Sequence, residues 1–151
     1  MRRYFFVLAV LSAGCATANN PMMNDNQEAY SVSGLVLDAV AEPLLLKRGE
    51  TLHITATVTN ETNAPVVKGF ASGCIYGFAL RNIGGELVAP PPPICTQNAP
   101  TVRYAPGEVV TLEFRWAWDD PDIEPGVYFV VAGFGERGEG ELAPPVEVRL
   151  Q

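Results

Sequence analysis

Three cysteines and one histidine are the residues of this 151-residue chain whose chemistry could define a site. Cys74 lies in GFASGCIYGFALRN (69–82), and Cys95 follows four prolines in APPPPIC. Such a cysteine could be a nucleophile, a metal ligand or half of a disulfide. A nucleophile needs a base beside the thiol, and nothing in the sequence brings His53 near Cys74. Two cysteines and one histidine also lack the spacing of a zinc motif.

The first fifteen residues indicate the compartment in which these thiols would lie. An apolar run from Tyr4 to Leu11 follows two arginines and is too short to span a membrane, which takes about 20 residues. This order, followed by small residues, is typical of a secretory signal. LSAGC resembles a bacterial lipobox, so we predict that residues 1–14 are a lipoprotein signal peptide and that Cys15 carries the lipid. The alternative is an ordinary signal peptide with a coincidental cysteine.

Export leaves an even number of cysteines for the folded domain. With Cys15 assigned to lipid, Cys74 and Cys95 remain, and an oxidising compartment favours their pairing. A disulfide would enclose twenty intervening residues and remove about 3 kcal/mol of denatured-state entropy in the chain-entropy model. We therefore predict a Cys74–Cys95 disulfide, with free thiols as the alternative.

The charge and the N-terminal composition limit the class of partner. The formal net charge is −7, which disfavours binding to nucleic acid or to anionic lipid headgroups. ATANNPMMNDNQEA is polar and aperiodic, so residues 15–29 are predicted to be the lipidated cysteine and a flexible tether. We expect an exported protein anchored through Cys15 to the cell envelope. It would lie at the outer membrane or in the periplasm of a bacterium with two membranes, and at the cell surface otherwise.

The elements that would position the cysteines show a period of two from Tyr30 onward. TLHITATVTN (51–60) alternates apolar residues with threonines and histidine, as in a half-buried antiparallel strand. VVTLEFRWAW (109–118) alternates in the same way, and VYFVVAGF (127–134) is apolar on both faces, which favours a central strand. We count about seven or eight strands and no helix. Residues 30–151 are thus predicted to form an all-β domain, an immunoglobulin-like antiparallel β-sandwich, with a closed barrel as the main alternative.

Two connecting segments are candidate binding loops. GERGEGE (135–141) alternates glycine with charge between two predicted strands, and the proline-rich segment is extended and stiff. Loops on a rigid sandwich commonly carry recognition, although each segment could equally be a solvated connection. The candidate residues are Glu136, Arg137, Glu139, Glu141, Pro91 and Pro92.

Other polar features have ordinary structural explanations. His53 is interpreted as a solvated residue on the polar face of its strand, with a binding contact as the alternative. DDPDIE (119–124) lacks EF-hand spacing and predicts a solvated acidic turn, with weak cation binding as the alternative. NET (60–62) is interpreted as a turn and not as a glycosylated sequon. No nucleophile elbow, phosphate-binding loop or zinc helix is present, so we predict no catalytic activity, no cofactor and no metal site.

Several segments resemble, in order, the BsuPI-like family of intracellular proteinase inhibitor domains. They are HITATVTNETNAPV, GFASGCIYGFALRN, GGELV, YAPGEVVTLEFRW and EPGVYFVVAGF, and they cover roughly residues 44–134. The resemblance implies an immunoglobulin-like β-sandwich and inhibition of serine proteases. The chain departs from the family pattern at APPPPIC, where a Trp-rich stretch is common, and at Cys74, where a polar residue is usual.

Together these features predict a membrane-anchored, non-catalytic lipoprotein whose sandwich binds protein partners. Proteinase inhibition, which the resemblance implies, is one form that this binding could take. The alternative is a structural lipoprotein that organises the envelope and inhibits nothing.

Overall fold

The structure, a computed structural model, describes residues 30–32, 34–90, 94–135 and 142–151. Its regular elements within these ranges are all β-strands. No helix in the described part is long and apolar enough to cross a membrane. The eleven strands are β1 (Tyr30–Val32), β2 (Leu35–Glu42), β3 (Leu45–Leu46), β4 (Thr51–Asn60), β5 (Val66–Gly69), β6 (Tyr76–Asn82), β7 (Leu87–Ala89), β8 (Thr101–Tyr104), β9 (Val109–Ala117), β10 (Gly126–Phe134) and β11 (Val146–Leu150).

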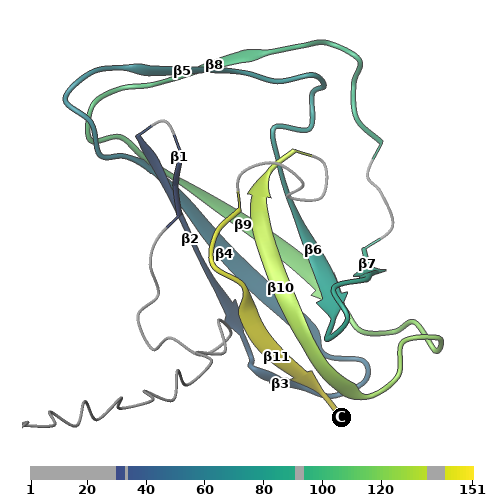
Figure 1. Cartoon of the computed structure of the whole chain (residues 1–151). Helices are drawn as coiled ribbons and strands as arrows, with labels where there is room; N and C mark the ends of the chain where they lie inside the picture. The colour runs from purple at the N-terminus through teal and green to yellow at the C-terminus, as the bar shows by residue number, and fades with distance from the viewer. Residues whose placement is uncertain (1–29, 33, 91–93, 136–141) are drawn as a thin grey trace, which may run out of the picture.

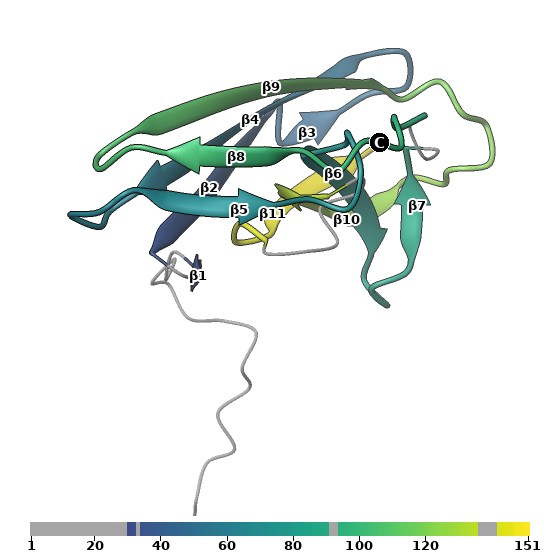
Figure 2. The ribbon, with the colours of Figure 1, turned by 90° about the horizontal axis from the view of Figure 1, so that it is seen from above.

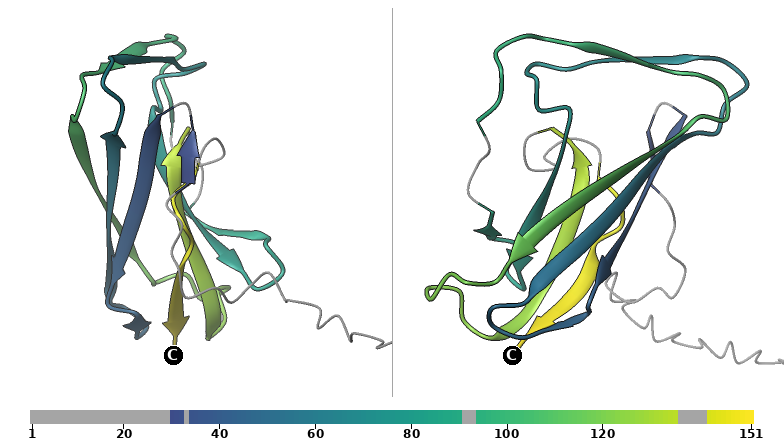
Figure 3. Two further views of the ribbon diagram at one scale, coloured as in Figure 1. Left: turned by 60° about the vertical axis from the view of Figure 1, so that its left-hand side comes forward. Right: turned by 180° about the vertical axis from the view of Figure 1, so that it is seen from behind.

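Nine of these strands form two sheets that pack face to face (Figures 1 and 3). One sheet has the order β1-β2-β4-β9, and the other has the order β3-β11-β10-β6-β7. Both sheets are open, so the predicted sandwich is confirmed and the closed barrel is excluded. The strand count exceeds the predicted seven or eight because several strands are only two to four residues long.

The core lies between the two sheets and follows the alternation of the sequence. On β4, Leu52, Ile54, Ala56 and Val58 are buried, while His53 between them is exposed and the alternating threonines are half-buried. β10 lies between β11 and β6 in the middle of its sheet and is buried on both faces over most of its length. The apolar run of β10 therefore marks a central strand, as predicted.

Two features confirm the immunoglobulin-like type. The chain crosses from the first sheet to the second between β2 and β3, and β3 then pairs in parallel with β11. Near the start of β10, the Tyr128 hydroxyl donates a 2.6 Å hydrogen bond to the Glu124 carbonyl oxygen. This back-bond to the preceding turn is the tyrosine corner of immunoglobulin-like sandwiches. Burial, and then the charge of Glu124, raise the pKa of Tyr128 above its ordinary value of 10.0, so the hydroxyl remains a donor at neutral pH.

The two remaining strands, β5 and β8, pair with each other outside both main sheets. Together with their flanking segments they form what we call the arm, residues 61–75 and 94–105. Seen from above, β5 and β8 run side by side across one end of the sandwich (Figure 2). The sequence did not predict this third, two-stranded sheet.

Candidate functional site

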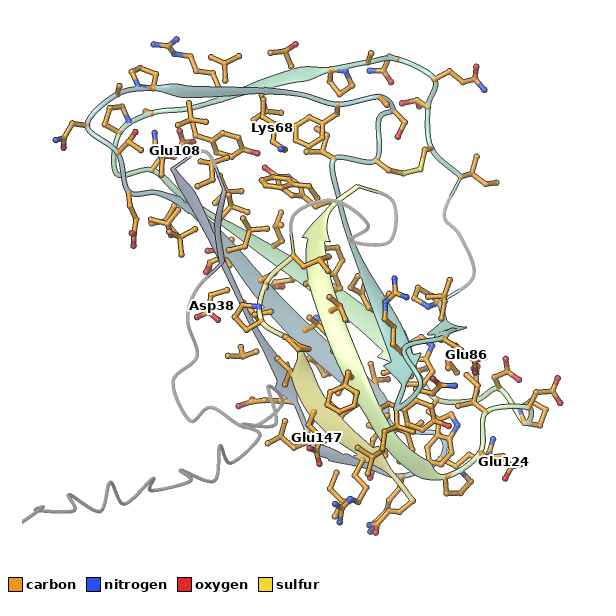
Figure 4. The ribbon with its side chains drawn as sticks, viewed as in Figure 1. Asp38, Lys68, Glu86, Glu108, Glu124 and Glu147 are labelled. Atoms are coloured by element: carbon orange, nitrogen blue, oxygen red, sulfur yellow. A yellow bond between two sulfur atoms is a disulfide. The ribbon has the colours of Figure 1, made fainter. Side chains whose placement is uncertain are left out.

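The arm contains both cysteines that the sequence singled out. Cys74 and Cys95 are joined by a disulfide, as predicted, with their Cα atoms 5.3 Å apart (Figure 4). Other predicted site residues, Cys15, Pro91, Pro92, Glu136, Arg137, Glu139 and Glu141, lie outside the described residues. Gly135, the residue before the four charged ones, donates a 2.9 Å hydrogen bond from its amide to the Ile75 carbonyl of the arm.

A fully buried asparagine, Asn60, fixes the base of the arm at the end of β4. Its side-chain amide nitrogen lies 3.0 Å from the carbonyl oxygens of Tyr104 and Ala105, and 2.9 Å from that of Ala64. Its side-chain oxygen accepts hydrogen bonds from the Thr62 amide (3.0 Å) and hydroxyl (2.7 Å). One side chain thus ties the segment that leaves the sandwich to the segment that returns. The sequence predicted a turn at NET, but it did not predict this buried network.

Aromatic rings support the underside of the arm. The Phe134 ring, at the end of β10, has its centroid 5.5 Å from Phe70, 5.7 Å from Tyr76 and 6.4 Å from Tyr104. The hydroxyls of Tyr76 and Tyr104 lie 2.7 Å apart and share a hydrogen bond. Lys68 points inward from β5, and its ammonium lies 4.7 Å from the Phe134 centroid (Figure 4). The arm therefore packs on the sandwich through rings and a cation–π contact.

The second segment of the arm, residues 94–105, begins with an exposed stretch, residues 94–100, which we call the bridged loop. It begins beside the disulfide. Ile94 is fully exposed, and the four residues from Thr96 to Ala99 are also exposed. An isoleucine that projects into water gains little stability from burial at this position.

Backbone hydrogen bonds hold the bridged loop to the neighbouring limb of the arm. The Gly73 amide donates to the Thr96 carbonyl and the Phe70 amide donates to the Pro100 carbonyl, both at 2.9 Å. A Cβ atom at Gly73 would lie 1.9 Å from the Thr96 hydroxyl oxygen, so a larger residue there would force the Thr96 side chain to move. Within the loop, the Thr96 hydroxyl also donates to the Asn98 side-chain oxygen. The loop is thus attached at three places while its side chains face solvent.

The chemistry of the bridged loop suits recognition. Its sequence, ICTQNAP, supplies an apolar side chain beside the disulfide and then hydroxyl and amide groups, with no charged residue. An apolar contact surrounded by polar groups is the general arrangement of a protein–protein interface.

The other polar features lie away from the arm. His53 is exposed on the outer face of β4, between Glu42 on β2 and Arg115 on β9. With Glu42, Pro43 and Leu44 it lines an open hollow at that face. Among the described residues, no group of three or more His, Cys, Asp or Glu side chains could hold a metal ion.

The predicted acidic turn is ordered by two side chains outside it. Arg48 donates hydrogen bonds to the carbonyl oxygens of Asp120 (2.7 Å) and Ile123 (3.1 Å). The buried Trp118 donates from its indole nitrogen to the same Ile123 carbonyl at 3.2 Å, and its ring lies 4.5 Å from the Arg48 guanidinium. These contacts explain the DDPDIE turn as a structural connection between β9 and β10.

Comparison with known proteins bears on the family and the fold. The family model for BsuPI, intracellular proteinase inhibitor, matches residues 45–138. No curated protein matches the chain. A solved structure of the alkylpurine DNA glycosylase AlkC from Pseudomonas fluorescens, bound to DNA containing an abasic site analog, aligns with a TM-score of 0.50 at 14% identity over 78% of this chain.

Two further solved structures share less of the geometry. A β-glucosidase from Listeria innocua in complex with isofagomine has a TM-score of 0.46 at 19% identity over 77% of this chain. The CARDB domain of the PF1109 protein from Pyrococcus furiosus, in complex with di-metal ions, has a TM-score of 0.44 at 18% identity, covering 77% of this chain and 91% of that one. The chain spans 30% of the glycosylase and 16% of the glucosidase. At 14% identity the likeness to the glycosylase concerns the fold alone.

Proposed function

This chain belongs to the BsuPI family of intracellular proteinase inhibitors, and we propose that it is itself a proteinase inhibitor that binds its protease through the bridged loop. The observation that carries the proposal is the loop's combination of exposure and attachment. Ile94 and the residues from Thr96 to Ala99 face solvent, while the disulfide and two backbone hydrogen bonds hold the segment in place.

Attachment is what distinguishes an inhibitor from a substrate. A protease cuts exposed chain segments that can adapt to its cleft, so an unattached loop of this kind would be cleaved. A loop that is already ordered loses little conformational freedom on binding, which favours a tight complex. If the bond after Ile94 were cut, the disulfide would still join the two fragments, because it links Cys74 to Cys95 across that bond. The loop would therefore occupy the cleft and dissociate slowly.

The loop's composition suggests the kind of pocket that it fits. Ile94 would enter an apolar specificity pocket, and the hydroxyl and amide groups of Thr96, Gln97 and Asn98 would bond the rim of the cleft. A trypsin-like pocket contains a buried aspartate that requires a basic side chain, and the bridged loop has none. The target would thus be a protease with an uncharged pocket.

A titration of purified protein against subtilisin-like and trypsin-like proteases tests the proposal. We expect stoichiometric loss of activity for at least one protease with an uncharged pocket. Ile94→Glu should weaken inhibition by about tenfold or more, because a charge enters an apolar contact. The matched control is Ile83→Glu, since Ile83 is also highly exposed but lies in the β6–β7 turn. If every protease stays active in the presence of excess chain, or if both variants inhibit equally, the proposal is wrong.

The proposal includes an envelope location through lipidation of Cys15, which rests on the LSAGC stretch and the preceding apolar run. Cells that express the chain should contain it in the membrane fraction, and Cys15→Ser should release it. Continued membrane association of that variant would contradict a lipid anchor. If the protein is membrane-anchored but inhibits no protease in the titration, the alternative of a structural lipoprotein that organises the envelope replaces the proposal.

A further inference from the structure

β9 is the long open edge of the sandwich. The outermost strands of the two main sheets are β1, β3, β7 and β9, and the first three contain only two or three residues. β9 contains nine residues and pairs, within the described part of the chain, with β4 alone. It forms the outer margin of its layer (Figure 3). Alternate residues along such an edge direct backbone N–H and C=O groups to solvent, and proteins usually shorten or cover these edges.

The inner face of β9 is apolar but incompletely covered. Val110, Leu112, Phe114 and Trp116 point toward the core, and each of them remains half-buried. On the neighbouring strand β4, the residues that share this face are at most 5% exposed. The difference arises because β4 has a strand on both sides and β9 has a strand on one. A further strand beside β9 would cover the edges of these side chains.

The outer face of β9 carries one acidic and one basic side chain. Neither of them lies opposite a carboxylate, lysine or arginine on β4. Glu113 lies opposite Thr55, and Arg115 lies opposite His53. Neither side chain forms an ion pair with another residue in the described ranges. Next to the open edge, the outer face of β9 thus presents a negative group and a positive group two residues apart.

We propose that β9 pairs with the β9 strand of a second copy of this chain, antiparallel and about a two-fold axis at Phe114. In this register Glu113 lies opposite Arg115 of the second copy, and Arg115 lies opposite its Glu113. On the inner face Phe114 meets its own counterpart, and Leu112 lies opposite Trp116. A two-fold interface repeats each contact, so the two charge pairs form together.

The alternating charges select this register over its neighbours. A shift of the axis to Glu113 places the two Glu113 side chains opposite each other, and a shift to Arg115 does the same for the two arginines. Like charges directly opposite destabilise a strand pair. A register that shifts by a single residue would turn the apolar face of one strand to solvent. The dimer therefore has one favoured alignment, with the two four-stranded sheets joined into one continuous sheet.

Charge-swap variants of the full chain, purified in a mild detergent, test this pairing by sedimentation velocity across a wide concentration range. The wild-type protein should show a concentration-dependent dimer. Glu113→Arg alone places two arginine pairs across the interface and should weaken dimerisation by about tenfold or more. Arg115→Glu alone should do the same. The double variant, with both substitutions, restores the complementary pairs and should dimerise like the wild type.

The matched control is Glu147→Arg on β11, a strand that already has β3 and β10 on its two sides. It reverses an exposed charge of the same kind and should leave dimerisation unchanged. A wild-type protein that stays monomeric up to its solubility limit overturns the proposal, and so does a double variant that dimerises no better than the single ones. The pairing is independent of protease inhibition, because β9 contains no residue of the bridged loop, and the single variants should inhibit as monomers.

Discussion

The body of the sandwich and the arm are held together by different forces. The body consists of long strands whose alternate residues are buried against each other, as on β4 and β10. The arm has two strands of four residues each and depends on a buried amide, a disulfide and a group of aromatic rings. The body therefore obtains its stability from apolar burial distributed over many residues, whereas the arm depends on a few contacts.

The largest difference between the two regions should appear when an aliphatic side chain is shortened in each. Ile54→Ala on β4 removes a side chain that is 1% exposed and should lower the free energy of unfolding by about 2–5 kcal/mol. Val67→Ala on β5 removes one that is 57% exposed and should change it by less than about 0.5 kcal/mol. Urea denaturation of both variants measures this contrast. Equal losses would mean that Val67 is packed in solution and that the outer side of the arm contributes to stability as the core does.

Removal of the disulfide should affect the arm strongly while leaving the body folded. The Cys74→Ser/Cys95→Ser variant should lose about 3 kcal/mol of stability, since 21 positions separate the two cysteines. Limited proteolysis should then cut the bridged loop first, and inhibition should convert into substrate cleavage. If the variant inhibits as strongly as the wild type, the backbone hydrogen bonds alone are enough to hold the loop.

Asn60 tests the connection between the two regions. Asn60→Ala removes the amide that bonds three carbonyl groups and leaves the buried Tyr104 carbonyl without that donor. We expect a loss of about 2 kcal/mol in the free energy of unfolding, because unsatisfied buried polar groups are costly. Amide exchange should accelerate in β5 and β8 more than in β10. Uniform acceleration across all three strands would contradict a local role at the base of the arm.

The smallest effect concerns the tyrosine corner of the body. Tyr128→Phe removes the hydrogen bond to Glu124 and should cost about 1 kcal/mol at neutral pH. The pKa of Tyr128 is raised in the folded state, so its hydroxyl contributes stability below pH 10.0 and loses that contribution as the pH rises through the raised pKa. The stability difference between wild type and variant should therefore shrink in alkaline solution. A difference that grows above pH 10.0 would contradict this assignment.

The body was predictable from the sequence because its signals are local. The alternation in 51–60 and 109–118 and the doubly apolar run in 127–134 identify β4, β9 and β10 without tertiary information. The disulfide was predictable from the parity of the cysteines once Cys15 was assigned to lipid. The short strands β1, β3 and β7 were missed because two or three residues are too few to display a period.

The arm could not be predicted, since its pairing depends on contacts between distant segments. VVKG and TVRY are four-residue stretches without a clear alternation, and about 30 residues separate them. The burial of Asn60 was unpredictable for the same reason. The sequence NET is compatible with any exposed turn, and Asn60 is buried only because the chain at Tyr104 and Ala105 packs against the end of β4. The exposure of Ile94 is equally a consequence of the folded arm.

Amide hydrogen exchange of the chain, alone and with a protease that it inhibits, tests the central claim most directly. If the bridged loop enters the protease cleft, the amides of Thr96, Gln97, Asn98 and Ala99 should become protected in the complex. The β6–β7 turn at residues 82–86 should exchange at the same rate in both samples. Unchanged exchange in the bridged loop, with protection at that turn or elsewhere on the sandwich, would show that another surface binds the protease.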